Sequence, residues 1–156
     1  MSRTLDIVVV PDTFQQIGDN QVVGIVYWDA EGHEFPEKCW NDSVVVIVLW
    51  WVESLLQLLR GSEETVELRF MEGPFWVRLT RAGQAGILLQ FVDGRHGRDV
   101  KYEKRESKKA VLRAIIDAAK ATVGTCKSMN LLIPEVTVLN RRISQLSKLE
   151  ENGVNS

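Results

Sequence analysis

The residues whose types could do chemistry are concentrated in one stretch, residues 27–51, with the sequence YWDAEGHEFPEKCWNDSVVVIVLWW. The stretch holds five acidic residues against a single base, Lys38, together with four tryptophans and one cysteine. Aromatic side chains supply buried area at a protein interface, and charge of one sign supplies orientation. This composition therefore predicts a recognition surface. The acidic residues are Asp29, Glu31, Glu34, Glu37 and Asp42, and the tryptophans are Trp28, Trp40, Trp50 and Trp51.

Nucleophilic catalysis by Cys39, with His33 or His96 as its base, is a second chemistry that these residue types allow. A thiol becomes a nucleophile only when a base lies within hydrogen-bond distance. The position of Cys39 between Lys38 and Trp40 suits a buried structural cysteine equally well, and that is the preferred interpretation. The chain has no GxSxG, P-loop or dinucleotide-binding motif. A small cysteine enzyme therefore stays the alternative hypothesis.

Metal binding is the third chemistry, because Asp29, Glu31, His33 and Glu34 place oxygen and nitrogen ligands within six residues. Metal sites usually take their ligands from regular elements, and no HExxH or CxxC pattern is present. We interpret these residues as a solvated acidic turn. We predict no metal site and no cofactor.

Charge is distributed unevenly along the chain, although the formal net charge is only -2. Residues 1–53 carry nine acidic and two basic groups, whereas residues 95–113 carry eight basic and three acidic groups. Such segregation can steer a partner if it persists on the folded surface. The acidic overall balance disfavours nucleic acid as that partner, because nucleic-acid-binding domains are normally basic.

The length of 156 residues predicts one domain, residues 1–151, followed by a disordered tail, residues 152–156. The sequence shows no signal peptide, and its longest apolar run, residues 44–52, is too short to span a bilayer. Two isolated cysteines are typical of reduced thiols in a cytosolic protein. We expect a cytoplasmic protein, and a monomer or a homodimer.

The first half of the chain predicts strands over residues 5–10, 22–28 and 33–35, with Pro11 ending the first and a polar loop over residues 12–21. Residues 41–60 predict one long helix, with Asn41 and Asp42 as N-caps and Gly61 as the stop. Val46 and Trp50 lie on one stripe of that helix. Either another element of the chain covers this stripe, or the stripe is a docking surface. The preferred interpretation is that another element covers it.

Four short alternating segments, residues 65–71, 75–80, 87–92 and 99–104, predict an antiparallel meander with one face packed and one wet. Trp76 falls on the wet face. Residues 107–123 predict an amphipathic helix ending at Gly124, and Pro134 opens a last helix. Together these elements predict an α+β fold in which an antiparallel sheet of about five to six strands packs with three helices. The last helix repeats Val136, Leu139, Ile143, Leu146 and Leu149 as a seam for docking within the chain or for pairing with a second copy.

The segment YWDAEGHEFPEKCWNDSVVVIVLWWVESLLQLL resembles segments of the immunity proteins encoded beside bacterial polymorphic toxins. The resemblance covers residues 23–60 and consists of a strand, an acidic turn, the pattern FPxxxW and a long apolar helix. It implies a cytosolic, non-enzymatic inhibitor of a cognate toxin domain. No functional residue is carried over from it.

We therefore expect a protein-binding domain that occludes a basic surface of its partner. A small enzyme using Cys39 with a histidine, or a structural subunit associating through the last helix, remain as alternatives. The expected contact residues are Asp29, Glu31, Glu34, Glu37, Trp40 and Trp76.

Overall fold

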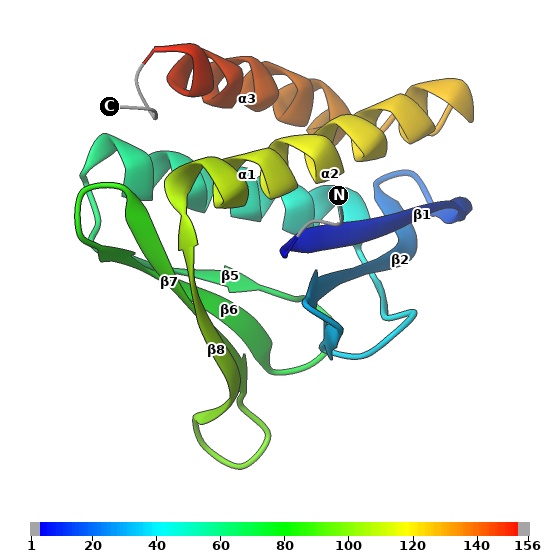
Figure 1. Ribbon diagram of the computed structural model, residues 1–156. Coiled ribbons are helices and arrows are strands. Elements are labelled where there is room, and N and C mark those ends of the chain that lie inside the picture. The colour runs from blue at the N-terminus through cyan, green and yellow to red at the C-terminus, as the bar shows by residue number, and fades with distance from the viewer. Residues whose placement is uncertain (1–3, 153–156) are drawn as a thin grey trace.

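The computed structural model describes residues 4–152 and confirms the α+β class with three helices and antiparallel strands (Figure 1). The strands form two sheets of four, where the sequence predicted one sheet of five to six. The first sheet contains β1 (Asp6–Ile17), β2 (Gln21–Ala30), β3 (His33–Phe35) and β4 (Asn41–Asp42). The second contains β5 (Thr65–Arg69), β6 (Phe75–Ala82), β7 (Gly86–Asp93) and β8 (Asp99–Ser107). The helices are α1 (Val44–Arg60), α2 (Lys108–Ser128) and α3 (Pro134–Glu151).

The first strand continues past Pro11 to Ile17, so the predicted stop and the polar loop are wrong. Proline is tolerated here because β1 is an edge strand and its pairing with β2 is irregular between Val10 and Gln15. The Thr13 hydroxyl donates to Val10 O and accepts from the amide of Ile25, which bridges the irregular part of the ladder.

The predicted long helix is present, but it begins at Val44 and not at Asn41. Asn41 and Asp42 pair with β2 as the short strand β4, and Ser43 takes the N-cap position. The predicted stop is confirmed: Gly61 adopts φ 86°, and its amide donates to Leu58 O.

The other two helices both pack on α1, and α2 also packs against β1 (Figure 1). α2 runs through Gly124 to Ser128, so the predicted end is wrong. Thr125 and Cys126 are buried, and this packing outweighs the low helix propensity of a single glycine. The seam of α3 is buried at Val136, Leu139, Ile143 and Leu146, against α1 and α2, so it docks within the chain.

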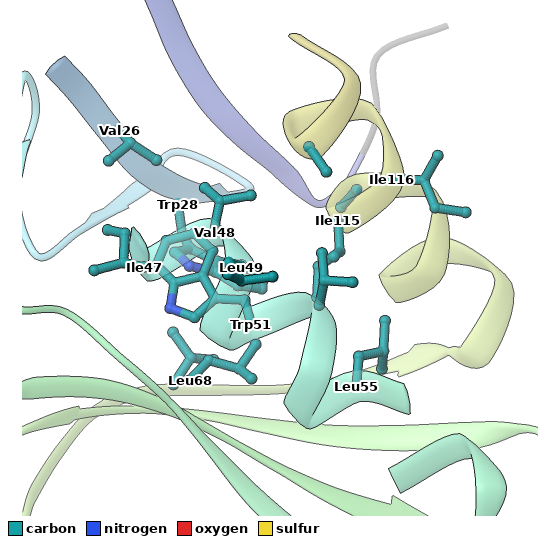
Figure 2. Packing of buried hydrophobic residues seen from close by; sticks show 14 of the residues in the cluster. Val26, Trp28, Ile47, Val48, Leu49, Trp51, Leu55, Leu68, Ile115 and Ile116 are labelled. Carbon is teal, nitrogen blue, oxygen red and sulfur yellow. The ribbon is translucent and has the colours of Figure 1, made fainter. Parts of the chain in front are cut away.

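The core is centred on α1, which contacts both other helices and reaches β2 and β5. Figure 2 shows Trp28 and Leu68 on either side of Trp51, which belongs to this helix. The rings of Trp28 and Trp51 lie 5.7 Å apart, and Trp51 Nε1 donates to Arg69 O at 2.8 Å. Trp50 of α1 is 40% exposed, so no other element fully covers that side of the helix. None of the described helices is long and apolar enough to cross a membrane.

The carboxylate of Asp42 is fully buried where β4, the start of α1 and the turn after β5 meet. It accepts hydrogen bonds from Trp40 Nε1 at 2.9 Å and from the Ser43 amide at 2.7 Å. It also accepts from the amides of Met71 and Glu72, at 3.2 and 3.1 Å. A buried carboxylate is stable only when donors surround it. Asp42 therefore fixes the position of the first sheet relative to the second.

Replacement of this carboxylate is expected to destabilise the fold. Asp42→Ala leaves two turn amides and an indole without their acceptor, and it should lower the free energy of unfolding by about 3 kcal/mol. Urea unfolding measures the change. Asp12→Ala, at an exposed acid of β1, is the matched control and should change stability by less than about 0.5 kcal/mol. A cost at Asp42 no larger than at Asp12 would contradict the structural role.

Candidate partner-binding site

The predicted acidic contact residues lie on the β2–β3 hairpin and on the loop that follows it. Asp29 is in β2 and Glu34 faces it in β3, Glu31 is on the turn between them, and Glu37 is on the loop. Glu31 and Gly32 form the tip of the turn with φ values of 52° and 89°. Asp29 Oδ1 accepts the Gly32 amide at 2.8 Å, so this carboxylate stabilises the turn itself. Asp29 is half-buried, and it is a weaker candidate for contact with a partner than the sequence suggested.

Glu31 is held by the basic segment of the same chain. Its Oε1 lies 2.7 Å from Nζ of Lys104, and the same ammonium lies 2.6 Å from Glu106 Oε2. Lys104 also donates to Thr4 O, and its side chain is only 9% exposed. The hydrogen bond from Lys104 lowers the pKa of Glu31. We call these residues the Lys104 cluster; it places the acidic and basic segments side by side and uses Glu31 within the fold.

A cleft of about 380 Å³ lies between the loop after β3 and the β7–β8 connection. Its lining includes Phe35, Pro36 and Phe75 as apolar groups, with acidic and basic side chains among them. The charged lining residues are Glu34, Glu37, Asp93, Arg95 and Lys101.

The basic residues of the cleft are already paired. Arg95 donates to both carboxylate oxygens of Asp93, and its guanidinium lies 5.4 Å from the centre of the Phe75 ring. These hydrogen bonds lower the pKa of Asp93 to about 2. Lys101 pairs with Asp99 at 2.7 Å.

Glu34 and Glu37 differ from the other acids of this stretch. Both are exposed and both line the cleft. Among the described residues, neither carboxylate has a hydrogen bond or an ion pair, although the charge of Glu37 helps to raise the pKa of Arg95 after the larger effect of Asp93. Of the predicted contact residues, these two are the ones whose charge is available to a partner.

The two predicted tryptophan anchors have structural roles. Trp40 is half-buried, and its ring packs edge-on against Phe75 at 5.3 Å while its indole nitrogen bonds Asp42. Trp76 was expected on a wet face, but it is only 7% exposed. The guanidinium of Arg69 lies 4.8 Å from its ring centre, and a Cβ at Gly94 would lie 2.6 Å from the ring. Trp76 is therefore removed from the candidate contact surface.

The geometry gives little support to nucleophilic catalysis by Cys39 with a histidine base. Cys39 is exposed, whereas the buried structural interpretation had been preferred. His33 stacks on Tyr102 with ring centroids 3.7 Å apart, and His96 lies on the β7–β8 loop. Within residues 4–152, no hydrogen bond joins Cys39 to either histidine. Across the same residues, no group of three or more His, Cys, Asp or Glu side chains is arranged to hold a metal ion.

Comparison with known proteins gives no match to a protein-family model, to a curated protein or to a solved structure. The immunity-protein resemblance of residues 23–60 therefore stays a prediction.

The ion pair in the cleft predicts a pH dependence of stability. Because the pKa of Asp93 is lower in the folded chain than in the unfolded chain, its stabilisation is complete above about pH 4 and is lost as the pH falls towards 2. Asp93→Asn should lower the free energy of unfolding by about 1 kcal/mol at pH 6.5, and the difference from wild type should disappear near pH 2. Urea unfolding at both pH values, with Asp99→Asn as the exposed control, tests this. An equal difference at both pH values would contradict it.

The two cysteines should differ in reactivity. Burial raises the pKa of the Cys126 thiol to about 11, whereas Cys39 is exposed. In the folded protein we expect Cys39 to react with a thiol reagent at the rate of an ordinary peptide thiol, and Cys126 to react only on unfolding. A Cys39 rate far above that of a peptide thiol would instead support the enzyme hypothesis.

Proposed function

We propose that this chain is a non-enzymatic protein-binding domain that acts in the cytoplasm by inhibiting a cognate toxin domain. The inhibitory role rests on the resemblance of residues 23–60 to immunity proteins. The mode of binding rests on the cleft, whose available charge is negative and whose lining is partly aromatic. Such a site is complementary to a basic surface, and this complementarity favours fast association and rejects acidic partners.

The observation that carries the proposal is that some of the acidic residues are bonded within the chain, whereas others are not. Asp42 accepts backbone amides, Glu31 pairs with Lys104, and Asp29 accepts the Gly32 amide of the β2–β3 turn. Glu34 and Glu37 are left exposed on one cleft. A lysine or arginine side chain of the partner would meet both carboxylates there.

The position of Arg95 supports this choice of ligand chemistry. Its guanidinium lies over the Phe75 ring inside the cleft, so this ring can hold a cation, and a partner arginine would have to displace Arg95 to use the same position. The sequence analysis could not bring Phe75 and Glu37 together, because Glu37 lies on the loop after β3 and Phe75 begins β6 of the second sheet.

The two alternatives differ in their support. The exposed thiol of Cys39 is the observation that keeps a small enzyme as the second candidate, and its measured reactivity decides that question. Self-association through α3 has lost the observation that motivated it, because the seam is buried within the chain.

Charge reversal at the cleft tests the proposal. The protein is used as bait in a lysate of its source organism, and the affinity for the captured protein is then measured with the purified pair. Glu34→Lys/Glu37→Lys should weaken that affinity by about tenfold or more, because both carboxylates would then repel the basic surface.

The control is Asp12→Lys/Asp19→Lys, which changes the net charge equally at exposed residues near the β1–β2 hairpin. It should retain nearly all of the wild-type affinity. Equal losses in both variants would mean that net charge and not the cleft determines binding. Full affinity in the Glu34→Lys/Glu37→Lys variant would remove the cleft from the proposal.

A further inference from the structure

The strand β5 forms an open edge of the second sheet. Arg81 N donates to Glu64 O, and Phe70 N donates to Phe75 O, both at 3.1 Å. Antiparallel pairs alternate between bonded and non-bonded positions, so the even-numbered residues of β5 bond to β6. The backbone groups of Thr65, Glu67 and Arg69 consequently point away from β6. Arg69 O on this side already accepts a hydrogen bond from Trp51 Nε1, so an added strand would share this carbonyl through its second lone pair.

The other edges of the two sheets carry features that oppose strand addition. β1 contains Pro11 and an irregular register, and β3 and β4 are three and two residues long. β8 is charged along its exposed side, and its Lys104 and Tyr102 contact Glu31 and His33. Prolines, irregular registers, short strands and contacts of this kind protect edges in natural sheets. β5 has a continuous register and no proline.

An apolar group lies beside the same edge. A groove of about 290 Å³ separates α1 from β5, and Trp50 on its wall is 40% exposed. α1 crosses above β5 in Figure 1. A strand added at β5 would run past this indole and remove it from water. The groove is lined by Trp50, Glu53, Ser54, Gln57, Glu67 and Arg69.

We propose that the edge of β5 binds β5 of a second copy of this chain. The two strands run antiparallel about a two-fold axis beside Leu68. Glu67 of each copy then faces Arg69 of the other, and both residues present outward backbone groups as the bonded positions require. Opposite charges across a strand pair stabilise it. Shifting the register to place Glu67 opposite Glu67 would bring like charges together.

Each of these side chains already has a partner in its own chain. Glu67 pairs with Arg69 and lies 3.6 Å from Arg78. Arg69 is 53% exposed in the first pair, and exposed ion pairs of this kind contribute little. When it turns to the second copy, the guanidinium gives up this pair and also its contact with the Trp76 ring. This proposal is independent of the cleft, which lies at Glu34 and Glu37.

Two reciprocal variants test the pairing by sedimentation equilibrium over a range of protein concentrations. The wild type should dimerise. Glu67→Arg places two arginines opposite each other and Arg69→Glu places two glutamates, so each should raise the dimer dissociation constant by about tenfold or more. An equimolar mixture of the two variants should restore dimerisation, because each charge then meets its opposite.

Further variants keep the test decisive. The double variant Glu67→Arg/Arg69→Glu should dimerise as a single species, since the swapped charges remain complementary. Glu103→Arg, on the exposed side of β8, should leave the dimer unchanged, and thermal unfolding verifies that every variant is folded. A wild type that stays monomeric throughout the concentration range would overturn the proposal. Failure of both the mixture and the double variant to associate would overturn it as well.

Discussion

The buried carboxylate of Asp42 is the interaction on which the rest of the molecule depends. It accepts hydrogen bonds from the indole of Trp40, from the amide of Ser43 at the start of α1 and from the turn that follows β5. A carboxylate can be buried only if these donors stay in place, so the three segments are held in one arrangement. The Trp40 ring is thereby held in its edge-on contact with Phe75. The loop that carries Glu37 is consequently positioned beside the second sheet, where Glu37 and Phe75 line one cleft.

The charged groups near the cleft fall into two sets: some form ion pairs within the fold, and others remain available to a partner. Lys104 pairs with Glu31 across elements that are 73 residues apart, whereas Arg95 pairs locally with Asp93, two residues before it. The acidic and basic segments of the chain meet at the Lys104 cluster, where Lys104 pairs with Glu31. Of the predicted contact residues, two exposed carboxylates remain, and both lie on a partly aromatic cleft. A local site of this kind selects a partner by geometry more than by the field of the whole molecule.

Periodicity predicted the elements whose packing is local. The α2 helix begins at Lys108, one residue after the predicted start, and the hydroxyl of its N-cap Ser107 accepts the Ala110 amide. The four-strand meander is confirmed. Tertiary contacts decided the rest. Trp76 is covered by Arg69 and Gly94, which a strand pattern cannot reveal. Asp42 resembled a helix cap, although two of its four donors, the amides of Met71 and Glu72, lie 29 and 30 residues away. The acidic stretch was identified by composition, but only three-dimensional pairing distinguishes Glu34 and Glu37 from Glu31.

Hydrogen exchange on the complex with the captured partner tests the central claim most directly, because it maps the contact surface without a substitution. If the cleft binds the partner, amides of residues 33–37 and 93–101 gain protection in the complex, while the exposed face of α3 is unchanged. Protection confined to α3 or to the β1–β2 hairpin, with none at these two segments, would contradict the account.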